Sequence, residues 1–184
     1  MIFYCPSEVP GLEKIAPGEN ILMSDSKIIA AFCLANPLEK PWNWFPCDFG
    51  SDGTVQYQEL YPNAFKECTE GKKGYIYVAE GEEASAEASG ELVSVFVPKN
   101  ELVVKEVIGI EDLYEWLMEE EDMGRFRLYP FEEKTRQEIL LWDNSILRYL
   151  SKYKMIENPD CPYAKFVREK LPNAWAKYEK LCGK

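Results

Sequence analysis

Residues 1–7 read MIFYCPS, and residues 21–37 read ILMSDSKIIAAFCLANP. The first stretch has three apolar residues followed by a polar Cys-Pro-Ser, which predicts a short strand over residues 2–4 that stops at a turn. The second stretch begins with another apolar run, and Ser24-Asp25-Ser26 then offers capping side chains for a helix. Apolar residues recur at helical spacing after this cap, and Pro37 ends the pattern. The chain therefore begins as strand, loop, strand and helix.

Further strands are predicted up to residue 110, because runs rich in β-forming residues alternate with turn signals. Residues 98–100 separate the last two runs by a spacing typical of a hairpin. The predicted strands cover 55–61, 74–79, 92–97 and 101–110.

The pattern becomes helical after residue 110. Asp112 is placed to cap a helix that Gly124 ends, and residues 132–153 form a long amphipathic pattern. Pro162 and Pro172 stand where prolines begin helices. We therefore expect an α+β protein with a β-rich core over residues 1–110, which contains one early helix. A helical C-terminal region, residues 111–184, packs on this core to form a single compact domain.

Composition narrows the range of partners. The 184 residues carry a formal net charge of -11, and both nucleic acid and anionic membranes require a basic surface. No stretch approaches the roughly 18 apolar residues of a membrane span, and a secretory leader is not recognisable. The six cysteines contain no C-x-x-C pair, so reduced thiols are expected. We expect a cytoplasmic protein that binds neither nucleic acid nor membrane.

The sequence contains no histidine. This excludes Ser-His-Asp triads, Cys-His pairs and imidazole bases, and it argues against a metal site. Any catalysis would depend on carboxylates, hydroxyl groups, lysine or an unassisted cysteine.

The N-terminal motifs, F-Y-x-x-S on the first strand and S-D-S before a helix containing A-A-F, resemble the ADP-ribosyltransferase fold. This fold is seen in poly-ADP-ribose polymerases, bacterial toxins and many small bacterial proteins. ELYPNA at 59–64, GYIY at 74–77 and FVREKLPNAW at 166–175 are also similar to those small bacterial proteins. The resemblance implies two small antiparallel sheets around a cleft that binds NAD.

The resemblance also implies site residues. A histidine on the first strand of the family holds the nicotinamide ribose, and Cys5 stands there, beside Tyr4 and before Pro6 in place of a glycine. Phe32 is the nearest aromatic residue to the tyrosine that stacks on nicotinamide, and Ser24 flanks the same site. Glu106 is the candidate for the catalytic carboxylate that stabilises the oxocarbenium charge, with Glu59 as the alternative.

Two functions remain open from these residues. One is an ADP-ribosyltransferase-like scaffold that is catalytically silent or altered and retains a nucleotide or NAD-type cleft. The other is a non-catalytic interaction module that binds a protein partner through its acidic surface and the aromatic loop 42–49. Each candidate also has a purely structural interpretation: Cys5 as a buried small side chain, Glu106 as the solvent face of a half-buried strand, and Ser24 as part of a helix cap.

Overall fold

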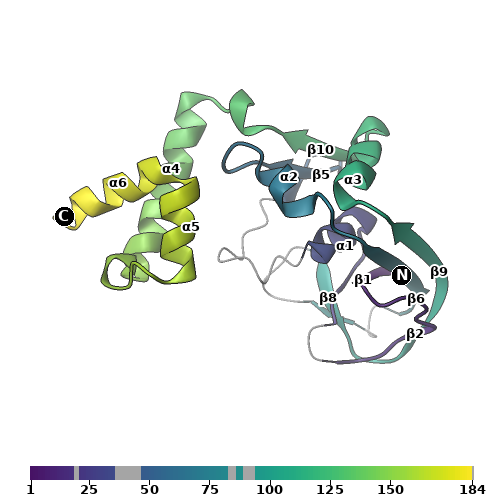
Figure 1. Ribbon diagram of the computed structural model, residues 1–184. Helices are drawn as coiled ribbons and strands as arrows, with labels where there is room; N and C mark the ends of the chain where they lie inside the picture. The colour runs from purple at the N-terminus through teal and green to yellow at the C-terminus, as the bar shows by residue number, and fades with distance from the viewer. Residues whose placement is uncertain (19–20, 36–46, 83–85, 89–93, 184) are drawn as a thin grey trace.

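A computed structural model describes residues 1–18, 21–35, 47–82, 86–88 and 94–183 (Figure 1). Its strands are β1 (Ile2–Ser7), β2 (Lys14–Ile15), β3 (Met23–Ser24), β4 (Cys47–Phe49), β5 (Val55–Gln58), β6 (Gly74–Glu80), β7 (Ala86–Ala88), β8 (Val95–Pro98), β9 (Leu102–Ile110) and β10 (Phe126–Tyr129). Its helices are α1 (Lys27–Leu34), α2 (Ala64–Thr69), α3 (Leu113–Asp122), η3 (Phe131–Glu133), α4 (Arg136–Lys152), η4 (Met155–Glu157), α5 (Pro162–Lys170) and α6 (Pro172–Leu181). The protein is thus a mixed α/β protein.

Seven strands form an antiparallel sheet in the order β2-β9-β6-β1-β3-β8-β7. The first strand is longer than predicted, because β1 pairs with β6 from Ile2 opposite Glu80 to Ser7 opposite Tyr75. The prediction of a turn at Cys5-Pro6-Ser7 is therefore wrong. Proline is tolerated in a strand where its missing N–H is not needed for pairing, and the other edge of β1 pairs with β3 only at Tyr4.

The predicted hairpin between β8 and β9 is also wrong. β8 pairs with β3 and β7, whereas β9 pairs with β6 and β2. Three strands separate β8 from β9 in the sheet order, yet the connecting segment between Pro98 and Leu102 is short. At about 4.8 Å per strand, a flat sheet would hold these ends farther apart than so short a connection spans, so the sheet curls.

A second, three-stranded sheet has the order β10-β5-β4. The expectation that both sheets are antiparallel is wrong for this one, because β10 runs parallel to β5, with Phe126 opposite Val55 and Tyr129 opposite Gln58. A parallel pair needs a long crossover connection. Here the chain between β5 and β10 includes α2, β6, β9 and α3.

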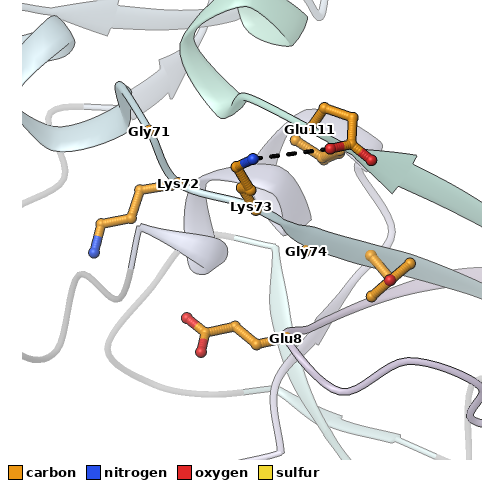
Figure 2. Close-up of a pocket in the computed structure, with 8 residues that line it drawn as sticks. Glu8, Gly71, Lys72, Lys73, Gly74 and Glu111 are labelled. Carbon is orange, nitrogen blue, oxygen red and sulfur yellow. Dashed lines mark ion pairs between the residues drawn. The ribbon is translucent and has the colours of Figure 1, made fainter.

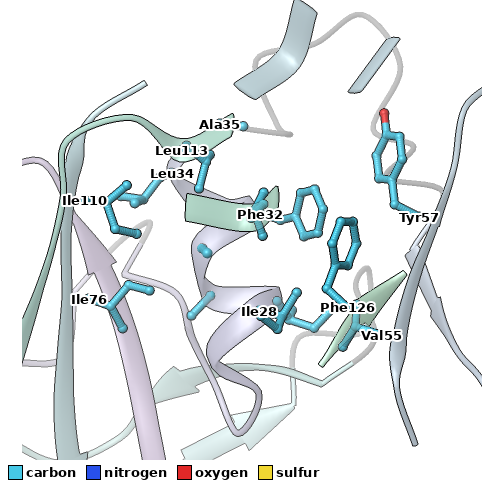
Figure 3. Packing of buried hydrophobic residues seen from close by; sticks show 14 of the residues in the cluster. Ile28, Phe32, Leu34, Ala35, Val55, Tyr57, Ile76, Ile110, Leu113 and Phe126 are labelled. Carbon is cyan, nitrogen blue, oxygen red and sulfur yellow. The ribbon is translucent and has the colours of Figure 1, made fainter. Parts of the chain in front are cut away.

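Helix α1 lies within the main hydrophobic cluster, between residues of both sheets and of α3 (Figure 3). Ser26 is its N-cap, with its side chain accepting a hydrogen bond from the Ile29 N–H, as the Ser24-Asp25-Ser26 motif predicts. Ile76 and Ile110 of the large sheet and Val55 and Phe126 of the small sheet pack in this same cluster. The helix is thus held between the two sheets.

The C-terminal helices begin where local signals place them, with one exception. α3 has Asp112 as its N-cap, Gly124 follows it at φ +71, and α5 and α6 start at Pro162 and Pro172. α4 begins at Arg136 and not near residue 132, because Thr135 and Glu138 form a capping box. Such a box satisfies the free N–H groups at a helix start and so fixes the first turn.

α4, α5 and α6 enclose a hydrophobic cluster of their own, which we call the three-helix unit (residues 136–183). In Figure 1 this unit lies to one side of the sheets, after the segment that follows β10. α3 belongs instead to the main cluster, through Leu113 and Leu117. Asp143, which interrupts the apolar stripe of α4, is buried and forms an ion pair with Lys177 of α6.

Candidate functional site

Three of the predicted site residues share one row across the large sheet. Tyr4 of β1 is opposite Ser24 of β3 and opposite Val78 of β6, and Val78 is opposite Glu106 of β9. Paired residues in an antiparallel sheet point to the same face. Tyr4, Ser24 and Glu106 therefore share a face, with Glu106 about 10 Å from Tyr4 because two strand spacings separate them.

Ser24 has a structural role in this row. Its side chain is fully buried, and its Oγ accepts a hydrogen bond from the Ser26 N–H at 3.0 Å. This bond shapes the turn that leads from β3 into α1. Tyr4 is half-buried and packs against the main cluster.

Cys5 lies on the opposite face from Tyr4, because side chains alternate along a strand. It is buried in a separate cluster with Phe3 and Tyr77. Burial raises the pKa of the Cys5 thiol to about 11, so the thiol is protonated at neutral pH. A protonated thiol is a poor nucleophile.

Phe32 is enclosed by other aromatic rings (Figure 3). The Tyr57 ring is stacked on it, with centroids 5.4 Å apart and planes at 9°. Phe65 and Phe126 also pack against it in edge-to-face geometry, with ring centroids 6.2 and 5.6 Å away. Only 2% of Phe32 is exposed, so its ring offers no open face for stacking on a base.

The two candidate carboxylates differ in their surroundings. Glu59 is buried, where its Oε1 accepts a hydrogen bond from the Phe65 N–H at 2.9 Å and its Oε2 accepts one from the Phe131 N–H at 3.1 Å. It thereby joins the start of α2 to η3. Glu106 is exposed beside a β-bulge in the pairing of β6 with β9, and the described residues give it no hydrogen bond or ion pair.

A pocket of about 410 Å³ lies elsewhere, at the end of the sheet where β1 ends and β6 begins (Figure 2). Its charged residues, two lysines and two glutamates, add up to no net charge. The Lys73 ammonium lies 3.9 Å from the Glu111 carboxylate. Its lining residues are Glu8, Gly71, Lys72, Lys73, Gly74, Tyr75, Ile110 and Glu111. None of the predicted site residues lines it. In the sequence, Glu70-Gly71-Lys72-Lys73 is typical of a turn and shows no sign of a ligand.

The aromatic loop proposed as a binding anchor falls largely outside the described residues, since Trp42, Trp44 and Phe45 all do. Phe49 is described, as the end of β4, and packs against the main cluster. Among the described residues, no cluster of three or more potential metal ligands is present. The helices in this part of the chain are all too short or too polar to cross a membrane.

Comparisons with known proteins gave no relatives: a scan of protein-family models and searches of curated proteins and of solved structures each found no match to this chain.

Proposed function

We propose that this chain is a non-catalytic protein-interaction module, built on an ADP-ribosyltransferase-like scaffold that no longer binds NAD. The enclosure of Phe32 by Tyr57, Phe65 and Phe126 carries the proposal. A ring that is only 2% exposed and packs against three others cannot hold nicotinamide unless the core opens. Cys5 adds support, because it lies on the opposite side of the sheet from Tyr4 and Glu106.

The remaining carboxylate is a weak basis for catalysis. Electrostatic stabilisation of a developing positive charge is effective in a water-excluded, preorganised site, and far weaker in bulk water. Glu106 is exposed on β9. An exposed carboxylate without fixed partners therefore supplies little of the stabilisation that transfer from NAD would need.

The test is incubation of the full chain with NAD at millimolar concentration. We expect no change in melting temperature and no release of nicotinamide above the buffer rate. Glu106→Gln serves as the matched control, since it removes the charge at nearly constant shape. Nicotinamide release by the unmodified chain that Glu106→Gln abolishes would contradict the proposal.

That outcome would favour a second candidate, an altered NAD-dependent ADP-ribosyltransferase. The row of Ser24, Tyr4 and Glu106 on one face of the sheet favours it. Thermal stabilisation by NAD without nicotinamide release would instead favour a nucleotide-binding protein that has lost turnover.

A further inference from the structure

The outward side of α4 carries exposed leucines that the three-helix unit does not use. Asp143, Ile146 and Leu150 point to the interior of this unit. At 3.6 residues per turn, the opposite side of the helix presents Gln137, Leu141, Asn144 and Arg148. Leu141 is 61% exposed and Leu140, beside it, is 46% exposed. A helix on the surface of a monomer ordinarily has polar residues there.

Two cations extend along this outward side. Arg148 and Lys152 are exposed, and the described residues give Arg148 no ion pair. Of the two acidic residues of α4, Asp143 pairs with Lys177 on the interior side, and Glu138, at the edge of the outward side, is held in the capping box. The outward side therefore combines apolar area with positive charge towards its C-terminal end.

The same sign of charge extends over the C-terminal part of the chain. Residues 136–184 contain ten Lys and Arg against six Asp and Glu, a net charge of +4. Residues 1–135 contain eleven against twenty-six, a net charge of -15. The negative net charge of the whole protein therefore includes a C-terminal part, residues 136–184, whose net charge is positive. A ligand bound mainly by this part would carry negative charge.

We propose that the outward face of α4, defined by Gln137, Leu140, Leu141, Asn144, Arg148 and Lys152, binds an acidic amphipathic helix of a partner protein. This inference rests on the proposed interaction function. Leu140 and Leu141 would pack on the apolar stripe of the partner helix, as helix-in-groove recognition requires. Arg148 and Lys152 would pair with carboxylates that flank this stripe, and the guanidinium of Arg148 can bind a carboxylate in a bidentate manner.

A second copy of the chain fits this face less well. Two α4 faces in contact would place exposed arginines of both copies in one interface, and each copy carries a net charge of -11. Like charges across an interface oppose association. The charge pattern therefore favours a different, acidic helix.

The experiment uses the full chain and two synthetic helical peptides with the same leucine positions. One peptide has Glu at the flanking positions and the other has Lys, and binding is followed by fluorescence anisotropy. We expect the Glu peptide to bind and the Lys peptide not to, with affinity falling as salt is raised to about 0.3 M. Leu141→Gln should weaken binding about tenfold and Arg148→Gln several-fold. Lys180→Gln, a charge change at an exposed position of α6, should leave it unchanged.

Several results would overturn this inference: equal binding of both peptides, no binding of the Glu peptide at about 200 µM, or affinity unaffected by Leu141→Gln. A dimer in sedimentation velocity that Leu141→Gln dissociates would also overturn it, since the occupant would then be a second copy. Leu141 is exposed, so circular dichroism should show both variants folded. If the chain releases nicotinamide and still binds the Glu peptide, the proposed absence of catalysis is wrong and the α4 site stands. If the chain releases no nicotinamide and binds no peptide, only the α4 site is wrong.

Discussion

Gly74 is the first residue of β6, and the atoms around it leave no room for a side chain. A Cβ atom there would lie 2.8 Å from Leu34 Cδ2 and 3.0 Å from the Ser7 carbonyl oxygen. Because Leu34 is buried, Gly74→Ala should overpack this site and destabilise the fold by about 1–3 kcal/mol. Urea unfolding measures the change. Gly109→Ala is the control, since its Cβ would meet nothing within 4 Å and should alter stability by no more than about 0.5 kcal/mol.

The Cys5 thiol should be inert to alkylation in the folded protein at neutral pH, because it is buried and its pKa is raised to about 11. Cys182 is exposed and should react at the ordinary rate of a free thiol. Mass spectrometry after brief iodoacetamide treatment distinguishes the two. Modification of Cys5 as fast as Cys182 would show that the strand opens readily.

The same pKa shift predicts how Cys5 affects stability. The unfolded thiol ionises near pH 8.5, whereas the folded thiol ionises near pH 11. Between these values the unfolded state binds fewer protons, so stability falls as pH rises. The contribution of the neutral thiol is fully present below the unfolded pKa. Cys5→Ala should make the unfolding free energy less dependent on pH across this window.

At the scale of elements, Asp112 has two roles at the start of α3: it caps the helix, and it forms a hydrogen bond with the Gly71 turn. Its Oδ1 accepts hydrogen bonds from the N–H groups of Tyr114 and Glu115 at 2.9 and 3.3 Å, and its Oδ2 accepts one from the Gly71 N–H at 2.8 Å. Asp112→Ala should cost about 2 kcal/mol, because a helix cap and a tertiary hydrogen bond are lost together.

Asp112→Asn tests the second of these roles. Asparagine keeps the capping oxygen, but its amide group cannot accept the Gly71 hydrogen bond at the same time. We therefore expect about half the loss of the alanine variant, as measured by thermal unfolding. Asp122→Ala, at the other end of the same helix, removes an acidic residue from an unfavourable position and should be neutral or slightly stabilising. An Asn variant as damaging as the Ala variant would mean that the bond to Gly71 dominates.

Elements with local signals could be predicted from the sequence, whereas their partners could not. Asp112, Pro162 and Pro172 start helices through interactions within one turn, so a short stretch suffices. The pairing of β9 with β6 instead of β8 depends on residues far apart in sequence. Phe32 shows the same limit at the candidate site. Its helical spacing was visible, but the rings that enclose it come from β5, α2 and β10.

At the scale of the whole molecule, the structure describes a small set of side-chain contacts between the three-helix unit and the rest of the described residues. Phe166 of α5 packs edge-on against Tyr61, with ring centroids 5.8 Å apart. Lys170 lies over the Tyr61 ring and pairs with Glu67 of α2 at 2.9 Å. This junction, as the described residues form it, contributes little beside the hydrophobic clusters on either side of it, because exposed ion pairs are typically worth less than about 1 kcal/mol.

Separate hydrophobic clusters on the two sides of this junction predict two thermal transitions in calorimetry. The three-helix unit should melt first, since a unit of about 50 residues buries a smaller fraction of its surface. Ile146 and Ile76 offer a matched pair, both fully buried, Ile146 in the three-helix unit and Ile76 in the main cluster. Ile146→Ala should lower only the first transition and Ile76→Ala only the second, each by several degrees, because losing a buried Ile side chain costs about 2–5 kcal/mol. A single transition that both variants lower alike would show that the junction couples the molecule into one cooperative unit.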